Sequence, residues 1–140
     1  MKRFAAVLAG TAALATLTGV QTASAVPGPP PTVCGNPGAP SYVTIRACIS
    51  INGNYVVTYA QANPTNPATW QDQDVSFDTT ASGFTPSGPP GPTVLVTAAG
   101  ARVGGLVGIA RCGSAVTATF SLDQPGWPPS TSTVSAFVNC

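Results

Sequence analysis

Few side chains in this chain could carry acid–base or nucleophilic chemistry. Histidine and glutamate are absent from the 140 residues, and the one lysine is Lys2. A Ser-His-Asp triad and a histidine-activated cysteine are therefore excluded. Asp72 and Asp74 alternate along a predicted strand, so their carboxylates could converge as in aspartate-based hydrolases. Because such aspartates more often form a solvated strand face, we expect no enzymatic activity and keep a small Asp-based hydrolase as a remote alternative.

The same acidic segment is the candidate metal site. Asp72, Asp74 and Asp78 offer oxygen ligands, which suit calcium in an exported protein. Their density is low and their spacing is not that of an EF-hand loop. We therefore favour a solvated acidic face, with calcium as the minor alternative, and expect no cofactor.

Aromatic and guanidinium side chains are the remaining candidates, because such groups dominate recognition energies. Arg46, Tyr55 and Tyr59 fall on one face of a predicted hairpin, and Trp127 lies in a loop rich in proline and glycine. We interpret these four residues as the candidate recognition surface. Two alternatives remain open: an N-terminal arm could cover Tyr55 and Tyr59, and Trp127 could fold back over the end of the domain.

The four cysteines, Cys34, Cys48, Cys112 and Cys140, predict two disulfides, because an even number in a small exported domain is typical of a disulfide framework. A zinc site would require short C-x-x-C spacings or histidine, and the chain has neither.

Hairpin register favours one pairing of these cysteines. Segments 114–122 and 134–140 alternate as half-buried strands on either side of a loop at 123–130. If they pair about Gly126, the pairs that face each other are Val116–Ala136, Ala118–Val134 and Cys112–Cys140. A one-residue slip would destroy the shared apolar face, so we predict the bridges Cys112–Cys140 and Cys34–Cys48.

The first 25 residues are typical of a secretory signal peptide. A positively charged start is followed by an apolar stretch and by the small residues Ala23-Ser24-Ala25. We expect cleavage after Ala25 and no membrane insertion afterwards, because the stretch falls short of the ~20 strongly apolar residues of a spanning helix. The predicted organisation is a signal peptide (1–25), an arm rich in proline and glycine (26–40) and one β-sandwich domain (41–140).

The rest of the chain predicts strands and no helix. The β-rich segments are 42–51, 54–62, 70–79, 93–98, 102–111, 114–122 and 134–140. They predict an all-β fold, a small Ig-like antiparallel β-sandwich of about seven strands with two disulfides. Residues 81–92 read as a loop, and Gly104, Gly105 and Gly108 predict a bulge or a close backbone approach. Phe77, Phe120 and Phe137 are expected in or near the core.

Asn52-Gly53 is the strongest local turn signal, and it predicts a type I′ hairpin turn. With these two residues as the loop, the facing pairs are Ile49–Val56, Ala47–Thr58 and Ile45–Ala60. The same register places Arg46 opposite Tyr59, close enough for a cation–π contact.

At the level of architecture, this layout resembles two classes of small exported bacterial β-sandwich proteins with two sequential disulfides. The first is the enediyne-carrying apoproteins of the neocarzinostatin type, which hold an apolar chromophore in a cleft; their second disulfide closes a very short loop, whereas Cys112–Cys140 would enclose a whole hairpin. The second is the α-amylase inhibitors of the tendamistat type, whose Trp-Arg-Tyr turn has no counterpart between Cys34 and Cys48. Neither resemblance implies a functional residue in this chain.

Charge excludes one class of partner. After signal cleavage, three arginines and four aspartates leave a net charge of −1, and no basic stripe exists to track nucleic acid. We expect a small secreted, non-enzymatic binding module whose partner is an extracellular protein, a glycan or a small apolar ligand. A structural or cell-envelope-associated secreted protein is the alternative.

Overall fold

The computed structural model describes residues 29–140. The predicted signal peptide (1–25) and the first residues of the arm (26–28) lie outside the described residues. Between residues 29 and 140, no helix is long and apolar enough to cross a membrane.

Nine strands and one short 3-10 turn make up the described chain. They are β1 (Thr32–Cys34), β2 (Val43–Asn52), β3 (Tyr55–Pro64), η1 (Pro67–Thr69), β4 (Gln73–Ser76), β5 (Asp78–Ser82), β6 (Thr93–Val96), β7 (Ala101–Ile109), β8 (Ala115–Leu122) and β9 (Ser130–Phe137). The prediction of about seven strands was too low for two reasons: the arm contributes β1, and the predicted strand 70–79 divides into β4 and β5.

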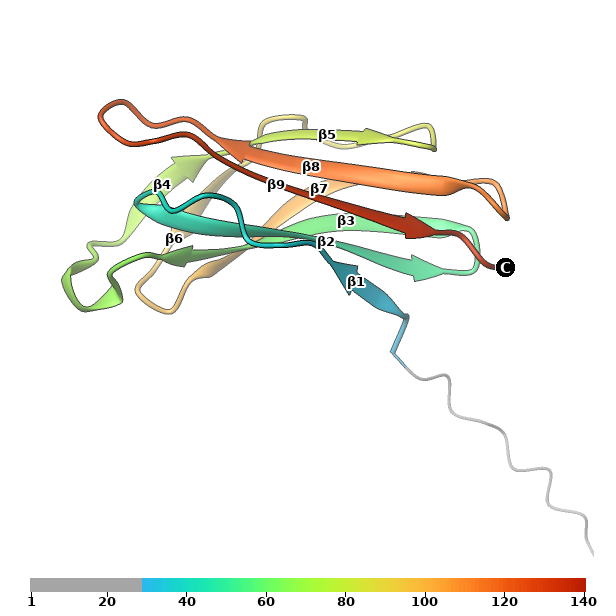
Figure 1. Cartoon of the computed structure of the whole chain (residues 1–140), viewed down its shortest axis with the longest axis horizontal. Helices are drawn as coiled ribbons and strands as arrows, with labels where there is room; N and C mark the ends of the chain where they lie inside the picture. The colour runs from blue at the N-terminus through green and yellow to red at the C-terminus, as the bar shows by residue number, and fades with distance from the viewer. Residues whose placement is uncertain (1–28) are drawn as a thin grey trace, which may run out of the picture.

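The strands form a two-layer antiparallel sandwich, as predicted. One layer is a four-stranded sheet in the order β1-β2-β3-β7, and the other is a three-stranded sheet in the order β5-β8-β9. Strand β2 packs against β8 and β9 across the core, and the small β4-β6 sheet closes one end of the sandwich (Figure 1).

The chain changes sheets at Phe77. Strand β4 pairs with β6, whereas β5, which follows after this one residue, pairs with β8. Val75 and Phe77 are both buried, Phe77 as predicted. The predicted strand is therefore interrupted at Phe77: the backbone before this residue joins the β4-β6 sheet, and the backbone after it joins the β5-β8-β9 sheet. Both side chains still point into the same core.

Side chains that alternate inward from both layers fill the core. The largest fully buried side chains are Phe77, Phe120, Ile45, Ile49, Val43, Val56, Val75, Val96, Val103, Val116, Val138 and Thr58. The expectation that Phe137 belongs to the core was wrong, since this side chain is 63% exposed. Val134 and Ala136 in β9 and Val138 directly after it point inward, so the two-residue period of a strand turns Phe137 to solvent.

The β2–β3 hairpin forms, but its predicted register was wrong by two residues. Asn52 pairs with Tyr55, so the turn residues are Gly53 and Asn54. Gly53 has φ of +61° and Asn54 does not have positive φ, which fits a type II′ turn, with glycine first, rather than the predicted type I′. Because the shift equals one full strand period, the same residues still face the core.

Two of the three glycines singled out in β7 act as predicted: Gly105 lies in a bulge and Gly108 at a close backbone approach, whereas a Cβ at Gly104 would meet nothing within 4 Å. The register between β3 and β7 shifts between Val57 and Tyr59, so Gly105 and Leu106 together oppose the single residue Thr58. The Thr58 hydroxyl donates a hydrogen bond of 2.7 Å to the Leu106 carbonyl within this bulge. A Cβ at Gly105 would lie 2.5 Å from Phe120 Cζ, so this position has no room for a side chain.

Both predicted disulfides, Cys34–Cys48 and Cys112–Cys140, are present. Strands β8 and β9 pair in the predicted register, with Val116 opposite Ala136, and this register is the one from which Cys112–Cys140 was predicted. The arm lies beside β2 at the sheet edge, where Gly35 and Gly38 continue the ladder of β1. Ser132 of β9 ties this edge to the other layer: its hydroxyl accepts from the Ala47 N–H and donates to the Asn36 carbonyl.

The segment 81–92, predicted as a loop, is partly paired. Ala81 and Ser82 extend β5, and isolated bridges join Phe84 to Ala110 and Ser87 to Val107. The segment therefore runs along the outer edge of β7. Its prolines confine it to such an edge, because they cannot donate to a central ladder.

Candidate ligand-binding site

A pocket of about 400 Å³ lies at the end of the sandwich where β2 begins and β3 ends. The connection from β3 to β4 and the loop between β8 and β9 meet at this end (Figure 1). Its volume lies at the lower end of the range of about 300–1,000 Å³ that is common for ligand pockets.

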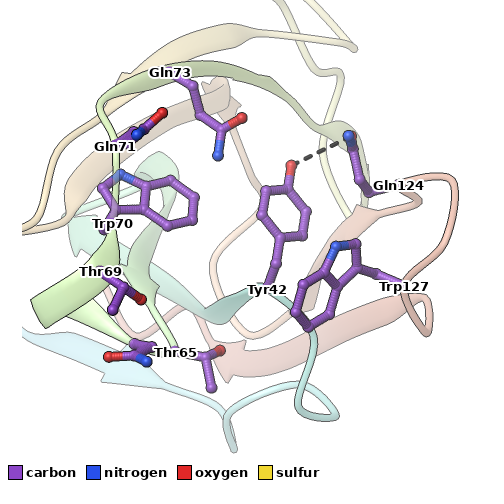
Figure 2. Close-up of a pocket in the computed structure, with 9 residues that line it drawn as sticks. Tyr42, Thr65, Thr69, Trp70, Gln71, Gln73, Gln124 and Trp127 are labelled. Atoms are coloured by element: carbon purple, nitrogen blue, oxygen red, sulfur yellow. Dashed lines mark hydrogen bonds between the residues drawn. The ribbon is translucent and has the colours of Figure 1, made fainter.

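Three aromatic rings line the pocket, and the phenol ring lies between the two indoles (Figure 2). The Tyr42 and Trp70 ring centroids lie 5.7 Å apart with an interplanar angle of 22°. The Tyr42 and Trp127 centroids lie 5.8 Å apart at 41°. These distances are typical of aromatic pairs in contact, so the three rings form a continuous apolar surface.

The backbone holds two of the rings firmly. Tyr42 precedes β2 and is 9% exposed, and its carbonyl accepts a hydrogen bond from the Thr65 N–H at 3.0 Å. Trp70 follows η1, and its Nε1–H donates to the Val96 carbonyl at 2.8 Å. This bond fixes the indole plane and satisfies its one donor.

The third ring is carried by a turn. The Trp127 N–H donates to the Gln124 carbonyl at 3.0 Å, with Pro125 and Gly126 between them. Gly126 has φ of +85°, as the third residue of a type II turn requires, and proline is common at the second. Trp127 is 52% exposed, so its ring stands at the rim of the pocket.

The remaining lining is polar but uncharged. It consists of amides and hydroxyls from Thr65, Asn66, Thr69, Gln71, Gln73 and Gln124. The Tyr42 hydroxyl donates a long hydrogen bond of 3.4 Å to Gln124 Oε1. Burial raises the pKa of the Tyr42 hydroxyl above its ordinary value, so this group keeps its proton and remains a donor.

Of the four predicted recognition residues, Trp127 alone lines this pocket. Its indole folds back onto Tyr42, as in the alternative considered for this side chain, and is still half exposed. Neither Tyr42 nor Trp70 was among the predicted recognition residues. The available signal was that both flank turn-rich segments at the same end of the predicted β2–β3 hairpin.

The other three predicted recognition residues lie on the outer face of the four-stranded sheet. The predicted Arg46–Tyr59 contact was wrong: Arg46 pairs with Gln61 in the shifted register, and its Nε–H donates to the Gly35 carbonyl at 3.0 Å. The guanidinium carbon that lies over the Tyr59 ring, 3.7 Å from its centroid, belongs to Arg102.

The described part of the arm (29–40) does not cover Tyr55 and Tyr59, because it lies beside β2, at the sheet edge, while these tyrosines lie on β3. Tyr55 is 44% exposed and Tyr59 is half-buried. The outer face is therefore a second exposed surface with aromatic groups, and it carries two arginines, Arg46 and Arg102.

The acidic segment is not gathered into a site. Asp72, Asp74 and Asp78 are all exposed. Within the part of the chain that the structure describes, no group of three or more histidine, cysteine, aspartate or glutamate side chains could hold a metal ion.

A second cavity, of about 510 Å³, lies toward the other end of β9. Its side chains are mainly apolar, among them Val33, Ile51 and Phe137. Two asparagines, Asn52 and Asn139, are its amide-bearing residues. It therefore offers fewer polar groups to orient a ligand than the aromatic pocket does.

Comparisons with protein-family models, with curated proteins and with solved structures give no match. The fold and the pocket define the class that can be stated: an all-β sandwich with two disulfides and an uncharged aromatic pocket at one end.

Proposed function

We propose that this chain is a secreted, non-enzymatic binding module of the Ig-like sandwich type, and that the aromatic pocket is its ligand site. The observation that carries the proposal is the half-exposed Trp127, held beside Tyr42, whose other side stacks on Trp70. Tryptophan is enriched among the residues that dominate binding energies where proteins meet their partners.

The chemistry of the pocket supports binding rather than catalysis. Its lining carries no carboxylate, cysteine or arginine, so it offers no ordinary general acid or base near neutral pH. Export is supported by the two disulfides, which form and persist in oxidising compartments.

Both tryptophans of the chain line this pocket, so intrinsic fluorescence reports on it directly. We expect saturable fluorescence changes with at least one of three probes: cellohexaose, decaproline or cyclohexanol. Trp127→Ala should weaken that binding at least about tenfold, because tryptophan is prominent among the residues that dominate binding energies. Thermal unfolding should change little, because the side chain is half exposed.

Tyr55→Ala is the matched control, since it removes an exposed aromatic from the outer sheet face. Its affinity should equal that of the wild type. If Tyr55→Ala loses binding and Trp127→Ala does not, the ligand site is the outer face. If none of the probes produces a saturable change, the binding function itself is wrong.

Location separates this proposal from a structural role in the envelope. We expect most of the protein in the culture medium when a producing culture is fractionated, since a soluble binding module requires no wall attachment. Recovery almost entirely in the envelope fraction would favour the structural alternative.

A further inference from the structure

We propose that the aromatic pocket binds a neutral sugar ring, as one unit of an extracellular glycan. This inference rests on the proposed binding function and adds the chemical class of the ligand. It follows from three properties of the pocket: aromatic surface, paired donor and acceptor groups, and the absence of charge from its lining.

The aromatic surface matches one side of a pyranose ring. A pyranose presents a flat patch of C–H groups, and an aromatic face is the apolar, electron-rich surface against which such groups pack. Trp127 offers this surface at the rim, while Trp70 is locked by its bond to Val96. The Trp70 ring therefore loses little conformational freedom on binding.

The polar groups match the edge of the same ring. Gln71 and Gln73 extend along one side of the pocket and Gln124 lies across from them, beyond Tyr42 (Figure 2). An amide donates and accepts at once, so it can bond two neighbouring hydroxyls of a sugar. Thr65 and Thr69 add hydroxyls on the remaining side.

The same groups argue against the other ligand classes. A purely apolar ligand would cover these amides without replacing their bonds to water. A proline-rich peptide offers carbonyl acceptors but no backbone N–H donors at proline, so it would leave the glutamine oxygens unpaired. A sugar acid would bring a carboxylate into a pocket that no arginine lines.

The size of the pocket sets the extent of the contact. About 400 Å³ accommodates a small ligand rather than a macromolecular surface. Trp127 lines the pocket and is 52% exposed, so a glycan chain can continue past this side chain into solvent.

Calorimetric titration of the full secreted protein tests the ligand class. The probes are the hexasaccharides of cellulose, chitin, mannan, xylan and amylose, with hexagalacturonate as the charged comparison. We expect at least one neutral hexasaccharide to bind, and hexagalacturonate to bind at least about tenfold more weakly, because its carboxylates would lose hydration without a partner.

Gln73→Leu is the decisive variant, because it keeps a side chain of similar length and removes the amide. Sugar binding should fall about fivefold, the loss expected for one hydrogen bond, whereas binding of cyclohexanol should stay equal or strengthen. Phe137→Ala, which removes an exposed aromatic toward the other end of β9, should change neither.

The outcomes distinguish the two proposals. If no neutral hexasaccharide binds while decaproline or cyclohexanol binds in a Trp127-dependent manner, the sugar inference is wrong and the binding function stands. Stronger binding of hexagalacturonate also overturns the inference. If no probe of any class binds, both proposals fail together.

Discussion

Replacing Phe120 with alanine is expected to lower the free energy of unfolding by about 3–5 kcal/mol, the usual cost of removing a fully buried phenylalanine. Phe120 lies on β8 and is 0% exposed. Its ring reaches the opposite sheet, since the Cζ atom would lie 2.5 Å from a Cβ at Gly105. Truncation therefore leaves a cavity between the two layers, next to a bulge that has little freedom to collapse into it.

Phe137→Ala is the matched control for this prediction. It makes the same chemical change on the neighbouring strand β9, but at a side chain that is 63% exposed. We expect the free energy of unfolding to change by about half a kcal/mol or less. Urea denaturation of both variants measures the difference. Equal losses of stability would mean that the Phe137 side chain is buried and that β9 does not turn it to solvent.

These two phenylalanines show that the sequence could predict strand register but not, from residue type, which side chains are buried. The pattern of β8 and β9 determined their register, because the apolar pairs and Cys112–Cys140 agree on one alignment. Phe137 was misassigned because its residue type was given more weight than its position. The three smaller residues that alternate around it, Val134, Ala136 and Val138, had already identified the inward face.

The β2–β3 hairpin shows a limit of a different kind. Asn-Gly predicts a turn, but glycine can serve as the second central residue of a type I′ turn or as the first of type II′. Both choices keep the same core face, so the hydrophobic pattern cannot choose between them. The partner of Tyr59 depends on that choice, and for this reason the cation contact belongs to Arg102 rather than to Arg46.

The candidate site was only partly predictable for a related reason. Trp127 stands out locally, because the run of proline and glycine around it predicts a loop. Tyr42 and Trp70 acquire their role only when the two sheets stack. Hairpin patterns align strands within each sheet, but nothing in them states which end of one sheet lies over which end of the other.

Replacing Cys112 and Cys140 together with serine is expected to lower the free energy of unfolding by about 3–4 kcal/mol. The two cysteines are 28 residues apart in sequence, and in the chain-entropy model a cross-link over a loop of this length restricts the unfolded chain by about that amount. Both cysteines are exposed, so serine creates no cavity and leaves the core unchanged.

The other disulfide is a less direct test of chain entropy, because Cys48 is 0% exposed and its replacement would also disturb packing.

The position of Cys112–Cys140 adds a second expectation to this variant. The bridge closes the β8–β9 hairpin at the end away from the loop that carries Trp127 (Figure 1). In the native state, the fluorescence of Trp70 and Trp127 and the affinity for any pocket ligand should therefore match the wild type, while the midpoint of urea denaturation falls. If the folded variant bound the pocket ligand more weakly than the wild type in the absence of urea, the bridge would be holding the pocket in shape as well as restricting the unfolded chain. In that case the two ends of the sandwich would be mechanically coupled through β8 and β9.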